Sequence, residues 1–61
     1  MNEYDVKRLA LVLSIQAEIE GMKAENMQRA SMGESMAYIE GDFEYRAEEL
    51  RVLASKHNEQ L

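Results

Sequence analysis

Residues 9–24, LALVLSIQAEIEGMKA, form the most regular stretch of the sequence and decide the predicted fold. Its apolar and small residues recur at steps of three and four, the spacing of one face of an α-helix. One stripe contains small residues: Ala10, Ser14, Ala17, Gly21 and Ala24. A second stripe contains bulky residues: Val12, Ile15, Ile19 and Met22. At 100° per residue the two stripes lie about 160° apart, so the pattern predicts a helix that is covered on both sides.

The helix that contains this stretch is expected to run from about residue 3 to about residue 30. Asn2 or Asp5 can cap its start, and acidic residues in its first turn favour the positive end of the helix dipole. Gly21 alone does not end it, because an interior glycine costs only about 1 kcal/mol relative to alanine and the periodic pattern resumes afterwards. Gly33 is the predicted point of reversal, as the left-handed residue that closes a helix end.

A connection over about residues 31–41 and a second helix over about residues 42–58 complete the chain. Two starts for the second helix remain open: Ser35 can cap an early start, and Asp42 can cap a later one. The predicted apolar stripe of this helix comprises Phe43, Ala47, Leu50, Leu53, Ala54 and His57.

Two helices joined by a short connection predict an all-α fold, an antiparallel helical hairpin. Because the sequence opens with Met1 and shows no linker, we expect residues 1–61 to be one complete domain. A domain of about 60 residues is marginal without an additional staple, and this sequence contains no cysteine for a disulfide. We therefore expect hairpins to pair into a four-helix bundle dimer or a higher oligomer, with the small stripe between copies and the bulky stripe against the second helix.

Composition and charge exclude several classes of function. The chain is acidic, with a formal net charge of −5, whereas binding to nucleic acid depends on clustered Lys and Arg. The longest uncharged run, residues 9–17, is about half the roughly 20 residues that cross a membrane, so no membrane partner is expected. The absence of cysteine fits a reducing compartment, and we expect a cytoplasmic protein.

The sequence predicts no catalytic, cofactor-binding or metal-binding residues. Carboxylate metal sites on helices need acidic residues three positions apart, and this chain has no such pair. Glu40, Glu44 and Glu48 recur at steps of four and are interpreted as a solvated face. His57 lacks a predictable orienting partner and is interpreted as structural or exposed.

The most consistent function is that of a small non-enzymatic accessory protein that self-associates and binds or inhibits a larger protein. The alternative is an oligomer that sequesters a small ligand in a pocket at the subunit interface, built from Arg29, Tyr38 and Ser31 or Ser35. Tyr45 and Val52 lie opposite the main stripe of the second helix and form a small candidate partner patch. The methionines Met22, Met27, Met32 and Met36 are expected mainly to fill the core.

Overall fold

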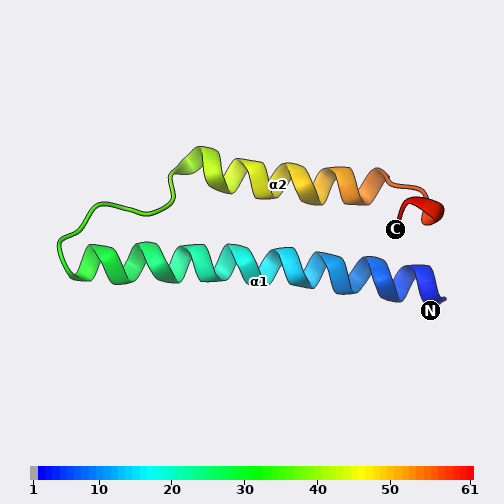
Figure 1. Cartoon of the computed structure of the whole chain (residues 1–61), viewed down its shortest axis with the longest axis horizontal. Helices are drawn as coiled ribbons and strands as arrows, with labels where there is room; N and C mark the ends of the chain where they lie inside the picture. The colour runs from blue at the N-terminus through cyan, green and yellow to red at the C-terminus, as the bar shows by residue number, and fades with distance from the viewer. Residues whose placement is uncertain (1) are drawn as a thin grey trace.

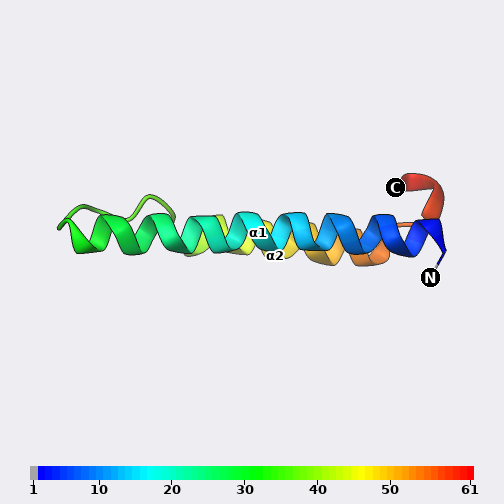
Figure 2. The same ribbon diagram turned by 90° about the horizontal axis from the view of Figure 1, so that it is seen from below.

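The computed structural model describes residues 2–61 as an antiparallel hairpin of two α-helices, which confirms the predicted fold class (Figure 1). Met1, the first residue of the predicted domain, lies outside the described residues. The hairpin measures 47 × 19 × 11 Å and forms a single flat layer (Figure 2). Its elements are α1 (Glu3–Ser31), α2 (Glu40–Ser55) and a short 3-10 helix, η1 (Asn58–Gln60).

The start of α1 is fixed by Asn2. Its side-chain Oδ1 accepts a hydrogen bond of 2.8 Å from the backbone N–H of Asp5, which satisfies one of the first N–H groups of the helix. Asn2 is therefore the cap, and Asp5 lies in the first turn beside the positive end of the dipole. The helix continues without interruption through Gly21, as predicted.

The end of α1 is a Schellman motif that requires Gly33. The N–H of Gly33 bonds to the carbonyl of Ala30 (3.1 Å), and the N–H of Glu34 bonds to that of Arg29 (2.8 Å). Gly33 has a φ of 74°, which a residue with a side chain rarely adopts. The predicted reversal at Gly33 is confirmed.

The start of α2 differs from both predicted starts. Ile39 is the N-cap, and the carboxylate of Asp42 accepts a hydrogen bond of 2.9 Å from its N–H, so Asp42 lies inside the first turn. An earlier start at Ser35 is excluded because Asn26 of α1 holds the connection. Its amide donates to the carbonyl of Tyr38 (2.8 Å) and accepts from the N–H of Tyr38 (2.9 Å), and α2 begins only after this bracket.

The end of α2 comes at Ser55, earlier than the predicted end at about residue 58. The guanidinium of Arg8, from the first turns of α1, donates to the carbonyl of Leu53 (2.7 Å) and to Oδ1 of Asn58 (3.1 Å). A cation at the negative end of a helix dipole stabilises that end, and here it also fixes the chain that follows. The second helix is therefore shortened by a contact from the first.

The core lies between the two helices and is thin. Only Met22 (7% exposed) and Leu53 (5%) are buried among residues 2–61. The predicted bulky stripe of α1 loses exposure as expected, and we call it the inner face: Val12, Ile15, Ile19 and Met22. From α2 the half-buried or buried apolar residues are Phe43, Ala47, Leu50 and Leu53.

Two expectations about the core were wrong. The predicted stripe of α2 is not buried at its end: Ala54 is exposed within α2, and His57 is exposed and lies beyond the last residue of the helix. The exposure of His57 fits its interpretation as a structural or exposed residue. Met27, Met32 and Met36 are also exposed, at 73%, 56% and 67%. α2 begins only at Glu40, so it does not lie beside the last turns of α1 or cover the connection (Figure 1). Within a single chain, Met22 is the one methionine of this cluster that fills the core.

Candidate interaction surfaces

Many large hydrophobic side chains of the hairpin are exposed. Exposure of large hydrophobic side chains reaches 38–73% over both helices and the connection. They are Tyr4, Val6, Leu9, Leu11, Leu13, Met27, Met32, Met36, Ile39, Tyr45 and Val52. Exposed apolar residues that gather on one surface mark interaction sites, whereas scattered ones do not. Two such gatherings are present.

The first surface lies on the side of α1 that faces away from α2, and we call it the outer face. Its members are all exposed in the single chain: Val6, Ala10, Leu13, Ala17, Gly21 and Ala24. Val6 and Leu13 are 53% and 59% exposed, and a Cβ added at Gly21 would meet no atom within 4 Å. The outer face is therefore unpartnered along most of α1.

The predicted small stripe coincides with this outer face except at one residue. Ala10, Ala17, Gly21 and Ala24 share it, whereas Ser14 lines the groove between the helices. The sequence interpretation missed the two large members, Val6 and Leu13. Their signal was present, because they lie seven residues apart and each is one helical turn before an alanine of the stripe.

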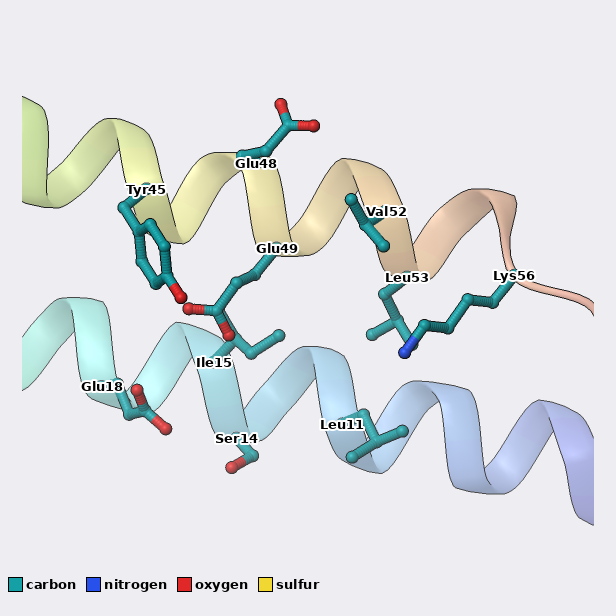
Figure 3. Close-up of a pocket in the computed structure, with 10 residues that line it drawn as sticks. All are labelled: Leu11, Ser14, Ile15, Glu18, Tyr45, Glu48, Glu49, Val52, Leu53 and Lys56. Atoms are coloured by element: carbon teal, nitrogen blue, oxygen red, sulfur yellow. The ribbon is translucent and has the colours of Figure 1, made fainter. Parts of the chain in front are cut away.

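The second surface is an open groove of about 510 Å³ between the two helices (Figure 3). Its floor is apolar, and Tyr45 points from α2 toward α1 while Glu48 points away. The predicted patch residues Tyr45 and Val52 line the groove from α2. Leu11 and Ile15 line it from α1. The full lining is Leu11, Ser14, Ile15, Glu18, Tyr45, Glu48, Glu49, Val52, Leu53 and Lys56.

Arginine side chains compensate the carboxylates beside the groove. Arg46 forms an ion pair of 3.0 Å with Glu18 across the helices and a second with Glu49. The hydrogen bond to Glu49 and the charges of Glu18 and Glu49 raise the pKa of Arg46, against the opposing effect of desolvation. The guanidinium also lies 5.7 Å from the centre of the Tyr45 ring. What the groove offers a partner is therefore its apolar floor.

The remaining predicted binding residues lie at the turn end of the hairpin, apart from the groove. Arg29 pairs with Glu25 (2.9 Å) and Glu34 (3.8 Å), and the hydroxyl of Ser31 donates to the carbonyl of Gln28 (2.7 Å). The backbone of Tyr38 is held by Asn26, as described above. Ser35 lies exposed in the connection. The ligand pocket expected from these residues stays a prediction, and the side chains of Arg29 and Ser31 have partners within the chain.

Other predicted features can be placed on the surface. No group of three His, Cys, Asp or Glu residues within residues 2–61 could hold a metal ion. Glu44 and Glu48 of the acidic row pair with Arg51, at 2.7 and 2.8 Å, and these hydrogen bonds raise the pKa of that arginine. None of the helices in residues 2–61 combines the length and apolarity needed to span a bilayer.

Comparison with protein-family models, with curated proteins and with solved structures finds no match for this chain.

Proposed function

We propose that this chain is a small non-enzymatic interaction protein that self-associates through the outer face of α1 and binds a larger protein through the groove. Self-association gives a dimer of hairpins in which the two long helices lie at the centre, each with its own α2 on the far side. Binding at the groove tethers, or inhibits, the larger partner.

One observation carries the self-association: the single hairpin exposes too much surface for its mass. The chain exposes 4696 Å², whereas a compact folded monomer of 7.0 kDa exposes about 4,000 Å². The excess is roughly 700 Å², close to the area of about 800 Å² that each partner buries in a standard interface. A second copy on the outer face would cover Val6 and Leu13, which α2 leaves exposed.

The groove supports the second part of the proposal. It combines an apolar floor with a tyrosine, the side-chain types that dominate the centres of protein interfaces. Its acidic neighbours are paired to Arg46 and Arg51, so a partner need not neutralise them. An apolar side chain of a partner protein, laid between Leu11 and Val52, is the occupant that this lining favours.

Substitution of Gly21 tests self-association because it should raise stability if Gly21 lies on a free surface and lower it if Gly21 lies in a packed contact. On a free surface, Gly21→Leu removes a poor helix former and stabilises the chain by up to about 1 kcal/mol. In a packed contact between two copies it overfills the interface, at a cost of about 1–3 kcal/mol. We expect wild type to have the mass of a dimer in light scattering, and Gly21→Leu to lower both the mass and the melting temperature.

Gly41 provides the matched control. It lies in α2, and a Cβ added there also meets no atom within 4 Å. Gly41→Leu should leave the mass of the dimer unchanged. A wild-type chain that is monomeric, or a Gly21→Leu variant that melts higher at unchanged mass, would contradict the proposal.

The groove is tested by affinity capture with Val52→Asp as the comparison. Val52 is 44% exposed, so the substitution places a charge on the floor without disturbing the buried core. Proteins identified by mass spectrometry with wild type should be lost with Val52→Asp and retained with Ala54→Asp, a similarly exposed position that does not line the groove. Equal capture by both variants would remove the groove from the proposed function.

A further inference from the structure

The alanine row of the outer face is centred on Ala17. This residue is the midpoint of α1, which runs from Glu3 to Ser31. Alanines lie seven residues to either side of it, at Ala10 and Ala24. Since seven residues are close to two helical turns, the three alanines form one straight row along the outer face.

We propose that two copies pair through this face in antiparallel orientation, with the two-fold axis passing beside Ala17. The inference rests on the self-association proposed above and specifies its geometry. An antiparallel pair centred on Ala17 overlaps the two α1 helices over their whole length. Any other antiparallel register overlaps them over a shorter length.

Side-chain sizes match in this register. Residues whose numbers add to 34 face each other, so Ala10 meets Ala24 of the second copy and Ala17 meets its own equivalent. Leu13, which is 59% exposed in the single chain, meets Gly21 of the second copy. Because Gly21 has open space where a side chain would be, it accepts the larger residue. The alanines let the helix backbones approach closely along the rest of the contact.

The flanks of the face are also complementary. Flanking residues on the same side of the contact meet with an offset of two positions from the central register. On one side, Lys7 comes beside Glu25 of the second copy, and the two-fold axis generates this opposite-charge pair twice. Glu25 is partly exposed, at 42%, and already bonds Arg29 of its own chain, so Lys7 adds to an existing cluster. On the other side, Leu9 comes beside Met27 of the second copy, which covers two side chains that are 44% and 73% exposed.

A parallel pair lacks these matches. In a parallel register each residue faces its own equivalent, so Leu13 meets Leu13 and Gly21 meets Gly21. The two leucines would hold the helices apart at Leu13, and the two glycines would leave a gap at Gly21, about two turns later. A packed interface does not tolerate such a gap. Glu20, at the margin of the face, would also lie beside Glu20 of the second copy, and like charges across a contact are unfavourable.

The antiparallel pair has a consequence for the groove. In the single chain α2 lies along one side of α1 (Figure 1). The outer face is the opposite side, so in the proposed dimer the four helices lie in one layer in the order α2, α1, α1, α2. A two-fold axis perpendicular to this layer places both grooves on the same side of it. The dimer is then bivalent, and two equal sites on one partner surface could be bound at once.

Disulfide trapping tests the orientation, and the chain suits it because its sequence contains no cysteine. Ala10→Cys and Ala24→Cys are made separately and oxidised alone and as an equimolar mixture. Disulfides require Cα atoms about 4.4–6.8 Å apart, whereas equivalent positions in the antiparallel pair are separated by about 21 Å along the helix. We expect a linked dimer only from the mixture, containing one chain of each variant, at about tenfold the yield of either variant alone.

Two controls keep the outcomes distinct. Ala17→Cys should cross-link alone in either orientation, and Glu59→Cys, in η1 and away from the face, measures random collision. Self-linking of Ala10→Cys and Ala24→Cys would show a parallel pair and overturn the inference while self-association stands. Efficient linking at Ala17 with none in the mixture would also overturn the register. If wild type is monomeric and Ala17→Cys links no faster than Glu59→Cys, both the inference and the proposed self-association fail.

Discussion

The inner and outer faces of α1 arise from the same helical periodicity but meet different surroundings. On the inner face, Met22 is 7% exposed because α2 packs against it. On the outer face, Leu13 is 59% exposed because nothing in residues 2–61 covers it. Periodicity therefore shows which faces of a helix are suited to contact, and the partner of each face depends on the length and placement of the rest of the chain.

The difference in side-chain size between the faces is equally informative. The inner face has branched and long side chains that fill the space between α1 and α2, whereas the outer face is mainly alanine and glycine. Small residues bury little area each, so they contribute stability only when backbones come close over a long contact. A 29-residue helix is long enough to provide such a contact.

The largest expected effect separates the two faces directly. Met22→Ala should lower the free energy of unfolding by about 2–4 kcal/mol, because it leaves a cavity in a core whose buried side chains within residues 2–61 are Met22 and Leu53. Leu13→Ala should leave the stability of the dissociated chain nearly unchanged but weaken dimer formation by about 1–2 kcal/mol, roughly tenfold in Kd. Chemical denaturation of dilute protein and analytical ultracentrifugation measure the two quantities.

Either of two results would contradict this difference between the inner and outer faces. If Leu13→Ala destabilises the dilute chain as much as Met22→Ala, the outer face is already covered within one chain. If Leu13→Ala has no effect at any concentration, the outer face is not a contact surface.

A smaller effect is expected at Asn26, a polar residue at the edge of the inner face. Asn26→Ala removes both hydrogen bonds to the backbone of Tyr38 and should cost about 1 kcal/mol, since these groups are partly buried. The loss should be concentrated in the connection before α2. We expect faster chymotrypsin cleavage after Tyr38, with cleavage after Tyr45 in α2 as the internal reference. Unchanged cleavage at Tyr38 would show that Asn26 does not hold the connection.

Much of the fold followed from local sequence signals. The bounds of α1 were predicted to within one residue at each end, because Asn2 and Gly33 act through bonds to neighbouring backbone. The bounds of α2 were not, because both are set by contacts distant in sequence. Asn26 bonds the backbone of Tyr38 before α2 begins, and Arg8 bonds the last turn of α2 and Asn58 beyond it.

The candidate surfaces divide in the same way. The row Ala10, Ala17 and Ala24 was readable from the sequence because residues seven apart lie on one helix face whatever the helix packs against. The groove was not readable, since Leu11 and Val52 come together only when α1 and α2 adopt a particular register.

The sequence by itself determined two helices, the glycine turn between them and an α1 with two apolar faces. These depend on spacing and on backbone bonds within a few residues. Only the tertiary structure decided where α2 begins and ends, that the groove joins Tyr45 and Val52 to α1, and that Ala54 and His57 lie outside the core. The physical reason is that these features depend on side chains meeting across the hairpin, and sequence periodicity within one helix carries no information about its register with the other.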